Sequence, residues 1–272
     1  TFSHKSVDFS ELDSADYNIN DTSLGVNFGI PLSEFNRFSF SSTLHSTDFK
    51  AGTLASSEVV AWEQAEGNSY NNLDLSAFWA SDTRDSALIP TTGSITRLAA
   101  ESTVPGSTLN YFKLNAKHRH FWPMYGDLVF SLNGELGYGD SYGNTLELPF
   151  YNNFFVGGPS SVRGYAARSI GPRDNNDTGE PLGGNFKVLT NAEFYVPSPI
   201  YSDTMRLVAF ADAGTVLNTT NDIDWGEMRY STGLGLSWMS PVGPLTLSYA
   251  AALKEDNLDQ VESFQFTLGT VF

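Results

Sequence analysis

Apolar and polar residues alternate with a period of two along most of this 272-residue chain. In the last segment, 264–272, the apolar side chains of Phe264, Phe266 and Leu268 alternate with mostly polar or small residues as far as the final residue. Successive side chains of a β-strand point to opposite faces, so the pattern predicts a strand with one apolar and one largely polar face. The same period recurs in segments 24–30, 38–44, 73–79, 94–103, 110–121, 128–138, 186–194, 205–214, 230–238 and 245–251, with a truncated segment near Phe2.

These segments predict about twelve strands of about ten residues, the length that a tilted strand needs to cross a bilayer. Their connections alternate between short turns and longer polar links. The short turns are 31–36, 85–93, 123–127, 197–203 and 241–244, and the long links are 48–71, 139–184, 215–226 and 253–261. This asymmetry favours an all-β, antiparallel transmembrane β-barrel, with a soluble β-sandwich as the alternative fold. We expect one domain over 1–272.

The amino-acid composition argues against several classes of function and structure. Fifteen Lys and Arg against 31 Asp and Glu give a net charge of −16, which argues against a nucleic-acid partner. The chain has no Cys, so disulfides, Cys-ligated zinc and thiol catalysis are excluded. It also has no apolar run long enough for a membrane helix.

Catalytic and metal-binding patterns are missing from the sequence. Only four His residues occur, and neither a GxSxG nor an HExxH motif is present. A Ser/His pair assembled across strands stays open, since such pairs are spatial. We therefore expect no enzyme activity, no catalytic residue, no metal and no cofactor.

A short helix is predicted within the 48–71 link. Ser57 precedes the run Glu58–Trp62 and could supply the N-terminal cap. We expect this helix to be a surface decoration of an external loop.

The polar face of the strands would line the interior of a barrel. It carries charged residues on several strands, namely Arg97, Glu101, Lys113, Lys117, Arg119, Lys187, Glu193, Arg206 and Asp212. Such charges suit a water-filled interior, which would fit a passive pore with charged selectivity residues. They equally suit a loop that folds inward and is held there.

The longest link, 139–184, is the candidate for such a loop. It contains Phe150, Phe154, Phe155, Val156 and Val162, whose apolar side chains need a place to be buried. We therefore expect the loop to fold back into the lumen. This would place Arg163 against Glu193 and Asp212, which face the lumen on consecutive strands and could accept charge-assisted, bidentate hydrogen bonds. The alternative is that Arg163 only fixes the loop.

Several motifs, in order along the second half of the chain, carry a family resemblance. They are VRGY at 162–165 (Val162, Arg163, Gly164 and Tyr165), GGN at 183–185, NAEF at 191–194, FADAGTV at 210–216, WMSPVGPLTLSYA at 238–250 and FQFTLGTVF at 264–272. The set resembles the BamA family of the bacterial surface-antigen superfamily. The WMSPVGP turn and the FQF ending look more like BamA than like TamA or the two-partner secretion transporters.

The resemblance implies an integral, multi-pass barrel of a Gram-negative outer membrane that catalyses the folding and insertion of other β-barrel proteins. Implied partners are unfolded outer-membrane protein clients, accessory lipoproteins, and outer-membrane lipid with lipopolysaccharide. In the family, the arginine matching Arg163 packs in the lumen against the carboxylates matching Glu193 and Asp212. A passive pore or a protein-translocating barrel of the same superfamily is the alternative function.

The family's last strand forms a lateral seam, or gate, at which a client strand can add. The matching residues here are Phe264, Phe266, Leu268, Gly269 and Phe272, and Gly269 would let the strand kink. The family barrel has about sixteen strands, preceded by periplasmic docking domains. This chain matches from about the fifth strand onward, so the first strands and those domains have no counterpart in it.

Overall fold

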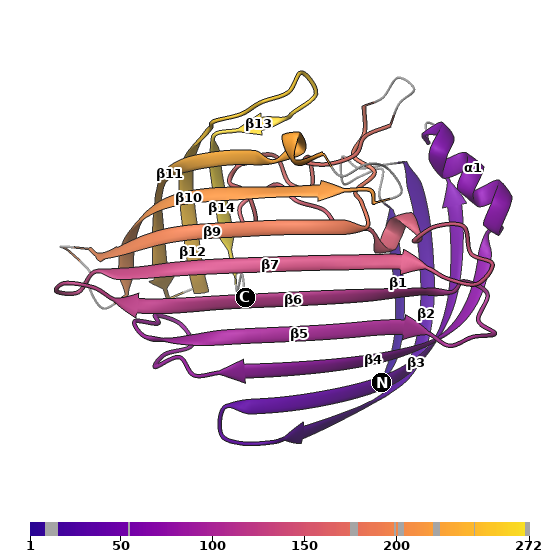
Figure 1. Cartoon of the computed structure of the whole chain (residues 1–272), viewed down its shortest axis with the longest axis horizontal. Coiled ribbons are helices and arrows are strands. Elements are labelled where there is room, and N and C mark those ends of the chain that lie inside the picture. Colours follow the sequence, from indigo (N-terminus) through magenta and orange to yellow (C-terminus); the bar gives the residue numbers. More distant parts are fainter. Residues whose placement is uncertain are drawn as a thin grey trace.

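The computed structural model describes residues 1–8, 16–53, 55–174, 179–198, 200, 204–219, 224–241 and 243–269. Within them, twelve strands form one antiparallel, strongly curved sheet in the order β1-β2-β3-β4-β5-β6-β7-β9-β10-β11-β12-β14 (Figure 1). The predicted number of strands and their antiparallel order are confirmed. The sheet is not closed, because the described residues give β1 and β14 a strand partner on one side only.

The strands overlap the predicted segments in order, but those over 17–31, 36–51 and 69–82 extend several residues beyond the predicted 24–30, 38–44 and 73–79. The first six are β1 (Phe2–Asp8), β2 (Tyr17–Pro31), β3 (Asn36–Ala51), β4 (Ser69–Asp82), β5 (Gly93–Thr103) and β6 (Tyr111–Pro123). The other six are β7 (Val129–Ser141), β9 (Phe186–Pro197), β10 (Met205–Leu217), β11 (Arg229–Ser240), β12 (Gly243–Ala252) and β14 (Phe264–Leu268). A second, two-stranded sheet pairs β8 (Gly164–Tyr165) with β13 (Val261–Glu262).

The helices are short. They are α1 (Ser57–Glu66) and the single-turn helices η2 (Phe150–Asn152) and η3 (Trp225–Glu227). Among the described residues, no helix has the length and apolar character needed to span a membrane.

The two faces of the sheet differ in the way that the alternation predicts. On β2, Leu24, Val26, Phe28 and Ile30 all lie on one face and are 54–63% exposed. We call this apolar face the outer face, because a bilayer would be its natural solvent. The opposite, inner face carries the charged residues and is covered by the link between β7 and β9.

The helix α1 is more than a surface decoration. Its N-cap is Ser56, whose hydroxyl accepts a hydrogen bond from the backbone N–H of Val59, so the prediction of Ser57 as the cap is wrong by one residue. Val59 and Trp62 are almost fully buried. They belong to an apolar cluster formed by Tyr17, Ile19, Phe49, Val59, Trp62, Tyr70, Leu109, Tyr111, Leu148, Phe150 and Leu182. The helix therefore covers one end of the sheet and contacts the long loop (Figure 1).

The last strand is shorter than its alternation suggests. Regular pairing of β14 with β12 ends at Leu268, and Gly269 follows with a φ of 115°. Glycine adopts this left-handed region without the steric cost that a Cβ would bring, and the predicted kink stays a prediction. Residues 270–272, and with them the predicted seam residue Phe272, lie outside the described residues.

Candidate functional site: a loop clamped to the inner face

The link between β7 and β9 packs its apolar residues on the inner face of the sheet. Phe154, Val156 and Val162 form a buried cluster with Leu189 of β9 and Val216 of β10, together with Tyr165 and Ile170. Val162 is completely inaccessible to solvent. The burial of these residues explains why a long external link in an otherwise polar set of loops is so apolar.

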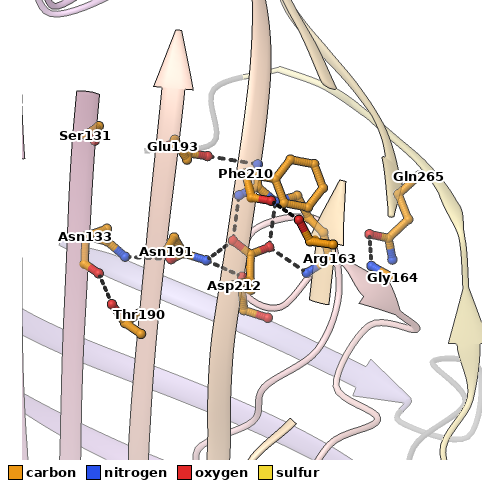
Figure 2. Close-up of polar contacts among 12 residues, drawn as sticks. Ser131, Asn133, Arg163, Gly164, Thr190, Asn191, Glu193, Phe210, Asp212 and Gln265 are labelled. Carbon is orange, nitrogen blue, oxygen red and sulfur yellow. Dashed lines mark hydrogen bonds and ion pairs between the residues drawn. The ribbon is translucent and has the colours of Figure 1, made fainter. Parts of the chain in front are cut away.

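Arg163 is held between the two carboxylates that the sequence singles out. Its Nε and Nη2 donate to Oδ2 and Oδ1 of Asp212, each at 2.7 Å, and its Nη1 lies 2.8 Å from Oε1 of Glu193 (Figure 2). The parallel pair of bonds to Asp212 is the bidentate geometry that only a guanidinium provides. The predicted contact of Arg163 with Glu193 and Asp212 is therefore confirmed.

The neighbours of this ion pair complete the clamp. Asp212 also accepts a hydrogen bond from Nδ2 of Asn191 at 2.8 Å, and Glu193 accepts one from the Tyr195 hydroxyl at 2.6 Å and is paired with Arg119. The ring of Phe210 lies 3.6 Å from the guanidinium carbon of Arg163. Asn191, Tyr195 and Phe210 precede or follow Glu193 or Asp212 by two positions, so their common face could have indicated them from sequence.

The other side of the VRGY motif reaches the last strand. Gln265 of β14 accepts a hydrogen bond from the backbone N–H of Gly164 at 3.3 Å (Figure 2). It also donates one to the Tyr165 carbonyl at 2.7 Å. The Tyr165 hydroxyl donates to the carbonyl oxygens of Tyr230 and Lys254. The motif thus connects β10, through Arg163, with β14, through Gln265.

The structure separates the seam residues from the clamp. Phe264, Phe266 and Leu268 point to the outer face and are 57–67% exposed, whereas Gln265 between them faces inward and is buried. Sequence reasoning missed Gln265 as a contact of the loop, since alternation only identifies it as a polar residue of the inner face.

The lysines that a pore would use for selectivity are engaged with the loop and with a shared carboxylate. Lys113 and Lys187 lie 5.0 and 5.5 Å from the ring centre of Phe154. Lys187 and Lys117 share the carboxylate of Glu135, with Lys117 Nζ 3.8 Å from Oε2. The two contacts with Phe154 hold the loop through cation–π attraction in addition to its apolar packing, whereas the contacts with Glu135 join neighbouring strands.

A second polar cluster on the inner face was not anticipated. Nδ1 of His45 lies 3.1 Å from both carboxylate oxygens of Asp21, and its Nε2 lies 3.7 Å from Oδ2 of Asp74. The three residues come from β2, β3 and β4, so only the register of the strands brings them together. Among the described residues, no three His, Asp or Glu side chains are arranged to hold a metal ion.

Fold and site together define an outer-membrane β-barrel protein with an inward-folded loop. The Omp85 superfamily domain matches residues 2–272, and the chain belongs to this superfamily. It is 38% identical over 222 residues to the outer membrane protein assembly factor BamA of Neisseria meningitidis serogroup B, covering 71% of this chain and 28% of that protein. BamA of Nitratidesulfovibrio vulgaris is 33% identical over 130 residues, which are 46% of this chain and 16% of that protein.

A solved structure agrees with these matches. BamA from Haemophilus ducreyi lacking POTRA domains 1–3 superimposes with a TM-score of 0.87 at 26% identity, over 97% of this chain and 56% of that one. The chain thus resembles BamA in sequence and in fold, and it is an integral β-barrel segment of a Gram-negative outer membrane. It spans little more than a quarter of the length of the Neisseria relative and about half of the solved chain.

Proposed function

We propose that the protein containing this chain assists the folding and insertion of other β-barrel proteins into the outer membrane. The names of its relatives support this role. The observation that carries the proposal is the pair of hydrogen bonds between Gln265 and the VRGY motif, since they link the clamped loop to the last strand.

The working part would be a lateral seam at β14. Within the described residues, this strand pairs with β12 over five residues, whereas β11 and β12 pair over ten. Its other edge has no strand partner among the described residues, and the N–H and C=O groups of such an edge can pair with an incoming strand. The reaction would be strand addition, with no covalent chemistry, no catalytic residue and no cofactor.

In this proposal the clamp positions the seam. Arg163 holds the loop on β10, and Gly164 and Tyr165 then hold Gln265 and the inner face of β14. The outer-face residues Phe264, Phe266 and Leu268 would contact lipid, and Gly269 would let the strand bend away from β12. The partners would be unfolded outer-membrane protein clients, accessory lipoproteins of an assembly complex, and outer-membrane lipid with lipopolysaccharide.

The experiment measures insertion of an unfolded client barrel into proteoliposomes that carry the full-length protein. Gln265→Ala removes both bonds to the loop, and Gln64→Ala, on the exposed side of α1, is the matched control. We expect faster insertion than into empty liposomes, a loss with Gln265→Ala or Arg163→Ala, and no change with Gln64→Ala. No acceleration by the unmodified protein, with accessory lipoproteins supplied, would contradict the proposal and favour a passive pore.

A further inference from the structure

A cavity with a basic lining lies on the short-turn side of the clamp. Its volume is about 210 Å³, and it is bordered by the ends of several strands and by the turn between β4 and β5. Six cationic side chains line it, namely Arg84, Arg97, Lys117, Arg119, Arg163 and Arg206. Among the described residues, Glu193 is the one acidic side chain in the lining. This concentration of positive charge stands out in a chain whose net charge is −16.

Four of these cations are already paired with carboxylates. Arg119 and Arg163 contact Glu193, and Arg163 also contacts Asp212. Arg84 donates to both oxygens of Asp82, at 2.8 and 2.7 Å. Lys117 lies near Glu135, as described above.

Two arginines remain available. In the described part of the chain, no carboxylate lies within ion-pair distance of Arg97 or Arg206. Arg206 donates one hydrogen bond, from Nη1 to the carbonyl oxygen of Pro90 at 2.8 Å. Each guanidinium therefore keeps donors that can bind an anion, and both carboxylate and phosphate groups fit its parallel N–H groups.

The cavity also has apolar walls, beside uncharged polar residues such as Asn133 and Ser161. Ile95, Phe121 and Val208 contribute buried side chains from β5, β6 and β10, and Ile89 and Pro90 contribute from the turn. The hydrogen bond from Arg206 to Pro90 ties that turn to the start of β10. The cavity is thus a small amphipathic pocket, in which charged donors lie beside apolar walls.

We propose that this cavity binds an acidic side chain of an extended polypeptide that enters from the short-turn side. The polypeptide nature of the ligand rests on the proposed function. The position of the cavity supports it, because a lipid phosphate would bring acyl chains that belong on the outer face, whereas the cavity opens on the inner face. Arg97 and Arg206 would supply the charge-assisted bonds, and the apolar wall would contact the methylene groups of the same acidic side chain.

The test measures binding of a fluorescently labelled peptide with alternating Glu and Leu residues to the full-length protein in nanodiscs. The double variant Arg97→Gln/Arg206→Gln removes both charges and keeps a polar amide at each position. Arg37→Gln removes an exposed charge at the same end of the sheet, outside the cavity, and is the matched control. We expect the double variant to bind at least ~10-fold more weakly, Arg37→Gln to bind normally, and a Gln/Leu peptide to bind as weakly as the double variant binds the Glu/Leu peptide.

Equal binding of the two peptides, or normal binding by the double variant, would overturn the proposal. Displacement of the peptide by inorganic phosphate at matched ionic strength would also overturn it, since the site would then take any anion. The readout is separate from client insertion. A protein that accelerates insertion but does not bind the peptide contradicts this inference alone, and one that binds the peptide without accelerating insertion contradicts the proposed function alone.

Discussion

Asp212 receives three hydrogen bonds from the single residue Arg163. Two come from the guanidinium and the third from the backbone N–H, at 3.1 Å from Oδ2. One carboxylate therefore fixes both the charge of the loop and the path of its main chain. Because the Asp212 side chain is fully buried, no water can replace these donors without opening the loop.

Replacing Arg163 should destabilise the protein strongly. In Arg163→Ala, Asp212 would lose both guanidinium bonds and keep the backbone N–H of residue 163 and the Asn191 amide, while Glu193 would retain Arg119 and Tyr195. We expect a loss of about 3–5 kcal/mol in the free energy of unfolding, the usual cost of leaving one member of a buried ion pair alone. The measurement is the unfolding temperature from the heat-dependent shift in gel mobility. Arg37→Ala, at an exposed position, serves as the control, and equal heat resistance of Arg163→Ala and wild type would contradict the clamp.

Replacing Asp212 by a neutral residue should restore part of the stability that Arg163→Ala loses. In the double variant Arg163→Ala/Asp212→Asn, no unpaired carboxylate is left at position 212. We expect its unfolding temperature to lie between those of wild type and Arg163→Ala, since much of the cost comes from the isolated charge. An additive effect of the two substitutions would show that Arg163 and Asp212 do not act as a pair.

Gly164 should not tolerate a side chain. Its φ is 90°, and a Cβ at this position would lie 3.0 Å from the Cβ of Ala250. We expect Gly164→Ala to cost about 1–3 kcal/mol and to expose the loop to protease. Gly67→Ala provides a matched control, because Gly67 has a φ of 89° and a Cβ there would meet no atom within 4 Å, so it carries the backbone strain without the clash. If the two variants were equally sensitive to protease, the close contact with Ala250 would not destabilise the loop, and the prediction would be wrong.

Trp62 should anchor α1 and the long loop together. Its ring makes edge contacts with Phe49, Tyr70 and Phe150, at centroid distances of 5.2, 5.5 and 6.1 Å. We expect Trp62→Ala to lower the free energy of unfolding by about 3–5 kcal/mol. Trp225, which is 54% exposed, is the control, and its replacement by Ala should have a much smaller effect on the unfolding temperature. If both variants unfold alike, α1 is only a surface decoration.

Glu147 should make stability depend on pH. Burial raises the pKa of this loop carboxyl group, and the nearby carboxylate of Glu66 raises the pKa further. Protonation therefore favours the folded state, and ionisation costs stability at pH values above the ordinary pKa of glutamate. We expect Glu147→Gln to raise the unfolding temperature at pH 8 and to leave it unchanged at about pH 4, near that ordinary pKa. Glu34→Gln, in an exposed turn, should have no effect at either pH, and a gain at pH 4 alone would reverse the assignment.

The strands could be predicted because a period of two is a local property with a simple physical cause. In the period-two alternation of their strands, Glu193 and Asp212 both fall on the polar positions, which predicts the inner face for both. The apolar residues of the loop next to Arg163 needed burial there. The diagonal position of the two carboxylates depends on the register, in which Phe210 pairs with Glu193 and Asp212 with Asn191. Register across neighbouring strands is not encoded locally, which is also why the cluster around His45 was missed.

Other features were beyond the sequence because they depend on contacts between distant segments. Gln265 looks like any polar residue of a strand until the loop is placed against it. The burial of Trp62 follows from the closure of the long loop over α1. Ser56 and Ser57 are both suitable N-caps, and only the backbone geometry decides in favour of Ser56.

The unequal lengths of the strand ladders give the sheet a mechanical order. Among the described residues, β14 pairs with β12 over five residues and β11 pairs with β12 over ten, so a force that separates neighbouring strands meets fewer paired residues at β14. Gln265 adds a tether from β14 to the loop, on the far side of that weak ladder. If β14 separated from β12, Gln265 would still hold it to the loop. The strand could then pair with β12 again once the force is removed.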